Sequence, residues 1–140
     1  MYLAGFGDAV DRGDATYAAA RDALMALVRD AGMPILAGTD TPAFCGSPGA
    51  SLALELRLLG QSGLSPLEVL QSATLTPAKV FGFGDRFGTI ETGMQADIVL
   101  LPANPLLDLS AYENPIGLIQ GGLWRDRSDL LRLRASHPEP

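Results

Sequence analysis

Ile35-Leu36-Ala37-Gly38-Thr39-Asp40 is an uncharged, mostly apolar run that ends on a single carboxylate. Residues 33–38 show no polar alternation, which is typical of a strand buried on both faces of a parallel sheet. A helical pattern over residues 14–31, followed by Gly32 as a C-terminal stop, directly precedes this strand and predicts half of a β–α–β unit. A carboxylate at the C-terminal end of a parallel strand lies where α/β barrels place their catalytic groups. We therefore predict an α/β fold with Asp40 as the candidate functional residue.

Three helices are predicted after this strand. Residues 51–60 alternate leucine with other residues as a strand would, but leucine, alanine, glutamate and arginine are strong helix formers and no β-branched residue is present, so we predict a helix. Ser65-Pro66-Leu67-Glu68 is a capping box with proline at the first helical position, and the helix is expected to reach about residue 73. Thr76-Pro77 predicts the start of a further short helix that ends near residue 81.

The second half of the chain has β character. Gly88-Thr89-Ile90-Glu91-Thr92-Gly93-Met94-Gln95-Ala96-Asp97-Ile98-Val99-Leu100-Leu101 contains a turn followed by a strand over residues 96–101. Gly121-Gly122, between apolar runs at 116–120 and 123–125, is a two-residue hairpin signal. Residues 126–135 predict a terminal helix. The architecture is thus expected to change near residue 84, from α/β to mostly β.

Composition and charge exclude several classes of function. The chain has 140 residues, 47% hydrophobic and 19% charged, which is enough apolar material for a buried core. Its net charge of −6 argues against a nucleic-acid-binding surface, which would be basic. The single cysteine, Cys45, allows neither an internal disulfide nor a cysteine zinc site. Neither a long apolar span nor a secretory signal is recognised, so we expect no membrane association and a cytoplasmic location.

Four side chains are weighed as candidates for chemistry. Asp40, placed just past a buried strand, suits a metal ligand or a general base toward a metal-bound water, although Thr39-Asp40-Thr41-Pro42 also permits a simple Asx-turn. Asp97 is expected to be structural and to bind backbone amides of the Gly93 turn. His137 lies in the tail and is expected to be solvent-exposed, and Cys45 is expected to be an ordinary thiol.

The order of motifs from about residue 14 to 125 resembles the C-terminal end of metal-dependent amidohydrolases, in particular the imidazolonepropionase-like and Xaa-Pro-dipeptidase-like branch. One such motif is weak evidence, whereas five in the same order are specific. The matching segments are Gly38-Thr39-Asp40, Ser51-Leu52-Ala53-Leu54-Glu55-Leu56, Gly63-Leu64-Ser65-Pro66-Leu67-Glu68-Val69-Leu70, Ala73-Thr74-Leu75-Thr76-Pro77-Ala78, and Gly88 to Val99.

The resemblance implies a role for Asp40 and also shows what is missing. Asp40 would be the last metal ligand of a TIM-type (β/α)8 barrel and its proton-transfer group, catalytic and metal-binding at once. The metal implied by the family is divalent, with zinc expected, and the substrate is a small amide, cyclic amide or dipeptide-like molecule. However, many relatives have histidine where this chain has Ala53, and the family's His-x-His pair and other ligands come from earlier strands, which this sequence does not contain. One aspartate cannot hold a catalytic zinc, which needs about three protein ligands.

We therefore interpret the chain as the C-terminal part of an amidohydrolase, with Met1 as an internal methionine, a misplaced start or a truncation point. Residues 1–84 would be the end of the barrel, 85–125 strands of a small β-sandwich, and 126–140 a terminal helix and tail. Alone, the chain is expected to bind no metal, to be inactive, and to be aggregation-prone, partly molten or homo-oligomeric. The alternative is a non-catalytic interaction or packing module derived from the same C-terminal region.

Overall fold

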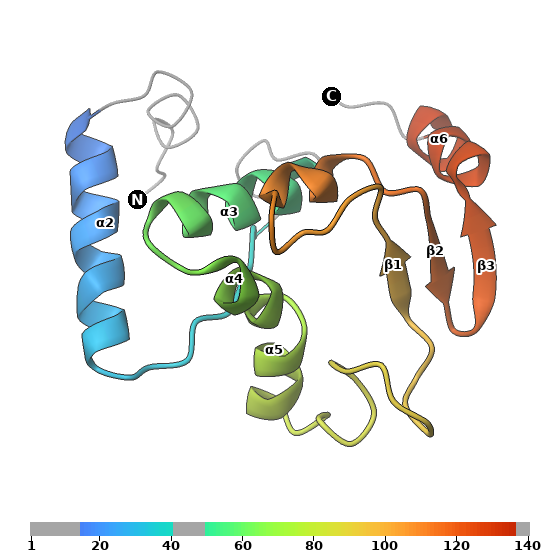
Figure 1. Ribbon diagram of the computed structural model, residues 1–140, viewed down its shortest axis with the longest axis horizontal. Helices are drawn as coiled ribbons and strands as arrows, with labels where there is room; N and C mark the ends of the chain where they lie inside the picture. The colour runs from blue at the N-terminus through green and yellow to red at the C-terminus, as the bar shows by residue number, and fades with distance from the viewer. Residues whose placement is uncertain (1–14, 41–49, 137–140) are drawn as a thin grey trace.

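The computed structural model describes residues 15–40 and 50–136, so the candidates Cys45 and His137 lie outside the described residues. The elements follow the chain in a helical half and a β half (Figure 1). The helical half contains α2 (Ala15–Asp30), α3 (Ala50–Gln61), α4 (Pro66–Ser72) and α5 (Leu75–Val80). The β half contains β1 (Ile98–Leu100), the 3-10 helix η1 (Leu109–Glu113), β2 (Gly117–Gln120), β3 (Leu123–Asp126) and α6 (Arg127–Ser136).

The helix predictions are confirmed, with one shift in a boundary. Helix α4 begins with the predicted capping box, in which the Ser65 side chain accepts from the Glu68 N–H and the Glu68 carboxylate accepts from the Ser65 N–H. Helix α5 begins after Thr74 rather than at the predicted Thr76. The Thr74 hydroxyl donates to the Leu70 carbonyl oxygen at 2.8 Å, so this side chain closes the preceding helix and makes no cap for α5.

The strand predicted over residues 33–38 is wrong for the chain as described: these residues pair with no other strand. A parallel strand needs a neighbouring strand to receive its backbone hydrogen bonds, and the sheet of the described residues contains only β1, β2 and β3. One backbone group of this segment is paired outside the sheet: the Ala37 N–H donates to the Ser72 carbonyl oxygen at 3.0 Å. The segment therefore runs behind α3 and α4 as irregular chain (Figure 1).

The sheet is an antiparallel meander in the order β1-β2-β3. Ile98 lies opposite Ile119, and Leu118 lies opposite Arg125. The hairpin between β2 and β3 turns through Gly121 and Gly122, as predicted; both have positive φ, 57° and 82°, which glycine adopts without the steric cost of a Cβ. Helix α6 follows β3 directly and contacts it.

The core lies in the helical half. Val69, Leu56 and Leu64 are its buried members, and Val69 is completely inaccessible to solvent. Ile35 and Ala37 pack against this cluster, as do Leu109 and Tyr112 of η1. The 3-10 helix was not predicted from the sequence, yet it contacts α3 and joins the two halves of the chain.

Helix α2 stands at the edge of the molecule, beside the other helices (Figure 1). Met25 packs against the core and the Arg29 guanidinium donates to the Gly63 carbonyl oxygen at 2.8 Å. Leu24 and Leu27, two apolar side chains three residues apart on this helix, are 60% and 68% exposed. Much of the face that the pattern predicts to be buried is therefore uncovered within the described chain.

Candidate active-site segment

Asp40 ends the segment 33–40, which packs against the core on one side. Ile35 and Ala37 contact the buried cluster, and the backbone then leaves the core so that Asp40 is exposed. Asp40 has a φ of 50°, the one positive φ among the non-glycine residues that the structure describes. Aspartate tolerates this left-handed conformation better than most residues, but it remains uncommon and occurs preferentially at turns and functional sites.

Two hydrogen bonds from two different helices fix the backbone just before Asp40. The carbonyl oxygen of Ser72, the last residue of α4, accepts from the Ala37 N–H. The Glu55 Oε1 atom, from α3, accepts from the Gly38 N–H at 2.7 Å. Ser72 is itself buried and its hydroxyl donates to the Val69 carbonyl oxygen at 2.7 Å. The Asp40 segment is thus attached to the most buried part of the molecule.

Glu55 belongs to the Ser51–Leu56 motif, and the sequence alone indicates no role for it. Its side chain is half-buried on α3, and its second oxygen, Oε2, is buried with no hydrogen-bond partner among the residues that the structure describes. The sequence does contain a signal for Glu55: it is the single carboxylate in the apolar stretch Leu52 to Leu56. A charged residue there is expected to have a partner, because charged side chains are rarely buried unless paired.

The other candidates are not brought to Asp40. The Asp97 carboxylate accepts from the Gly121 N–H at 2.6 Å, at the tip of the β2–β3 hairpin. The structural role predicted for Asp97 is therefore correct, but the predicted partner, the Gly93 turn, is wrong. Trp124 is 53% exposed on β3. His137 and Cys45 lie outside the described residues.

The described residues do not form a metal site by themselves. No group of three or more histidine, cysteine, aspartate or glutamate side chains lies close enough together within 15–40 and 50–136 to hold a metal ion. A catalytic zinc site needs about three protein ligands, and Asp40 supplies one carboxylate. The residues at hand therefore do not fit a complete metal centre.

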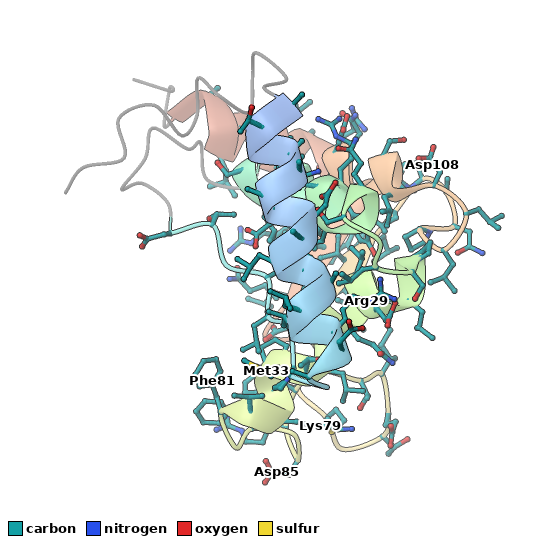
Figure 2. All side chains as sticks on the ribbon, turned by 90° about the vertical axis from the view of Figure 1, so that its left-hand side faces the viewer. Arg29, Met33, Lys79, Phe81, Asp85 and Asp108 are labelled. Carbon is teal, nitrogen blue, oxygen red and sulfur yellow. The ribbon has the colours of Figure 1, made fainter. Side chains whose placement is uncertain are left out.

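An open hollow of about 640 Å³ lies at the opposite end of the 33–40 segment. It is lined by the C-terminal end of α2, the following turn and α4, including Arg29, Met33 and Glu68. Figure 2 shows Arg29 and Met33 at this end of α2, with Lys79, Phe81 and Asp85 around α5 below them. Asp40 is not part of the lining. Arg29 donates to the Gly63 carbonyl oxygen, and Glu68 belongs to the capping box of α4.

Comparison with known proteins decides the family. The sequence profile of the amidohydrolase family matches residues 10–124. The chain belongs to this family. Ochratoxinase from Aspergillus niger is 36% identical over 83 residues, which cover 58% of this chain and 16% of the relative. Imidazolonepropionase from Erwinia tasmaniensis is 39% identical over 61 residues, covering 40% of this chain and 15% of that protein.

A solved structure agrees with this assignment. The crystal structure of a Xaa-Pro dipeptidase with bound methionine in the active site superimposes with a TM-score of 0.68 at 28% identity. The superposition covers 75% of this chain and 25% of the dipeptidase. The chain therefore spans about a sixth of the length of these two curated relatives and a quarter of the length of the dipeptidase. The branch expected from the motifs is confirmed, and the relatives imply a barrel-like amidohydrolase fold.

Family membership supports a hydrolase fragment, and amidohydrolases generally use divalent metals. A membrane-crossing segment is not found: within the described part of the chain, no helix is both long and apolar enough to span a bilayer.

Proposed function

We propose that this chain is the C-terminal portion of a metal-dependent hydrolase that acts on carbon–nitrogen bonds of small amides, cyclic amides or dipeptide-like molecules. The observation that carries the proposal is the setting of Asp40. It has an uncommon backbone conformation, it is exposed, and it stands at the end of a segment attached to the core by hydrogen bonds from α3 and α4.

The role proposed for Asp40 is proton transfer. Its carboxylate accepts a proton from the attacking water as the new carbon–oxygen bond forms, and then delivers that proton to the leaving nitrogen as the carbon–nitrogen bond breaks. An exposed carboxylate on a well-anchored backbone can reach a substrate and keep its direction, which such a transfer requires. Ligation of a metal by Asp40, with zinc as the expected ion, stays a prediction because it needs further ligands beyond those the structure describes.

The proposed placement in the parent fold follows the chain order. The α2 helix, the 33–40 segment and the helices after it would be the last barrel elements, with a boundary near residue 84. Strands β1 to β3 would belong to a small β-sandwich. The uncovered apolar face of α2, with Leu24 and Leu27, supports this placement, because a barrel helix packs that face against neighbouring elements.

A second candidate is a non-catalytic interaction or packing module. The observation in its favour is the combination of exposed apolar side chains with the absence, in the described ranges, of a metal-ligating group. The coding sequence upstream of Met1 discriminates the two. A His-x-His motif after a predicted strand in the same frame supports the hydrolase, whereas a stop codon or unrelated sequence supports the module.

A zinc titration of the purified 140-residue chain tests the site directly. Isothermal calorimetry is expected to show no stoichiometric, tight zinc binding, because Asp40 alone cannot provide a complete coordination sphere. Tight binding of one zinc ion per chain that is lost in Asp40→Asn would show instead that the chain itself holds a complete site.

A further inference from the structure

The Glu55 side chain makes a contact that local packing does not require. Its Oε1 atom accepts from the Gly38 N–H at 2.7 Å, across 17 residues of sequence. A hydrogen bond between an ionised carboxylate and a backbone N–H is stronger than one between neutral groups, so it is an effective way to fix one peptide unit. The peptide unit fixed here lies two residues before Asp40.

Stability alone does not favour a carboxylate at this position. The Oε2 atom is buried and has no partner within the described ranges, and a buried, unsatisfied carboxylate oxygen is costly. Neighbouring positions of α3 hold leucine and alanine, and Ala53 and Leu56 are buried. An apolar residue at position 55 would avoid the cost of Oε2 while leaving the helix intact. The gain from glutamate is therefore the hydrogen bond to Gly38.

We infer that Glu55 is a positioning residue for Asp40, holding the backbone of Gly38 so that the Asp40 carboxylate keeps a fixed direction. The significance of this role rests on the function proposed for Asp40, but the contact can be tested independently of it. In the described residues, 33–38 have no strand partner, so hydrogen bonds from helices restrain this backbone where no β ladder does. Ser72 restrains Ala37, and Glu55 restrains Gly38, which is the nearer of these two residues to Asp40.

Hydrogen exchange at the Gly38 amide, followed by mass spectrometry with single-residue fragmentation, tests the inference on the 140-residue chain. In Glu55→Ala the Gly38 amide is expected to exchange about tenfold to a hundredfold faster, since a hydrogen bond to a charged group is lost. Glu55→Gln is expected to restore part of the protection, because its amide oxygen still accepts, though more weakly. The Val69 amide, bonded within α4 to the Ser65 carbonyl oxygen, is expected to exchange as in the unaltered chain.

Two controls make the result specific. Glu113→Ala removes a different carboxylate that contacts α3, through an exposed ion pair with Arg57 at 2.8 Å, and should leave Gly38 exchange unchanged. Asp40→Asn should also leave Gly38 exchange unchanged. The contact between Glu55 and Gly38 is therefore tested separately from the chemistry proposed for Asp40. Equal exchange of Gly38 in the unaltered chain and in Glu55→Ala would overturn the inference. So would acceleration in Glu55→Ala that affects Val69 as much as Gly38, because Glu55 would then support the whole core.

Discussion

The Asp97 carboxylate accepts a hydrogen bond from the Gly121 N–H at 2.6 Å, connecting the start of β1 to the tip of the β2–β3 hairpin. A second bond, from the Gly122 N–H to the Ala96 carbonyl oxygen at 3.0 Å, runs alongside it. Together they hold the hairpin turn against the strand that precedes it by more than twenty residues. Asp97 is thus a structural residue of the sheet, whereas Asp40 is the candidate for chemistry.

Replacing Asp97 with alanine is expected to loosen the hairpin. The lost hydrogen bond is exposed to solvent, so the cost should be about 1 kcal/mol, below the roughly 1.5–3 kcal/mol typical of bonds to charged groups. Faster amide exchange at Gly121 and in β3 would measure it. Asp97→Asn keeps an acceptor oxygen, so its amide exchange should lie between that of the unaltered chain and that of Asp97→Ala. Unchanged exchange in the alanine variant would contradict the structural role.

Gly117→Ala is expected to disrupt the pairing of β2 with β3. A Cβ at this position would collide with the ring of Trp124 and lie 2.7 Å from the Arg125 carbonyl oxygen, which is backbone and cannot move aside. Circular dichroism and amide exchange of β3 should report a loss of sheet. Gly84→Ala is the matched control, since a Cβ there meets only ordinary contacts with Lys79. An intact hairpin in Gly117→Ala would contradict the close approach.

The N-terminus of α4 is expected to lose stability in acid through Glu68. Hydrogen bonds from the Ser65 hydroxyl and then from its backbone N–H hold the pKa of Glu68 below its usual value of 4.5. The folded-state pKa is therefore lower than the unfolded one. The contribution is fully present above the unfolded pKa and is lost as the pH falls through the folded one.

Amide exchange in the first turn of α4, corrected for the intrinsic pH dependence of exchange, measures this effect. Protection should be constant from neutral pH down to the usual glutamate range and should decline below it. Glu68→Gln preserves the capping geometry without a titrating group, so its protection should not change over the same range. A decline of equal size in Glu68→Gln would assign the effect to another residue.

Self-association of the isolated chain is expected to depend on the uncovered face of α2. Leu24 and Leu27 are 60% and 68% exposed on neighbouring turns, and contiguous apolar surface of this kind promotes association. Analytical ultracentrifugation should show less association in the Leu24→Gln, Leu27→Gln double variant. Leu107→Gln removes a side chain that is 85% exposed in a loop, and it controls for a general change in surface polarity.

A monodisperse monomer that melts in one sharp transition before any substitution would contradict this prediction. It would show that the described contacts suffice for a stable unit and that the apolar face of α2 needs no cover.

Short-range sequence signals were confirmed where the stabilising contacts are also short-range. The Ser65–Glu68 capping box joins residues three apart, and the Gly121-Gly122 turn needs only the backbone freedom of glycine. The start of α5 was predicted two residues late because Thr76-Pro77 resembles a cap, whereas Thr74 bonds back to Leu70. The predicted strand at 33–38 was wrong because a strand depends on a distant partner, and the described residues offer none to this segment.

The sequence by itself determined the family, the order of the helices and the β half, and the choice of Asp40 as the candidate carboxylate, because motifs and periodicity are properties of nearby residues. Only the tertiary structure decided that Asp97 binds Gly121, that η1 packs on α3, and that Glu55 holds Gly38. These contacts join residues 17 to more than 50 positions apart. Which distant groups meet is set by packing around the Val69 cluster, and no local pattern encodes that choice.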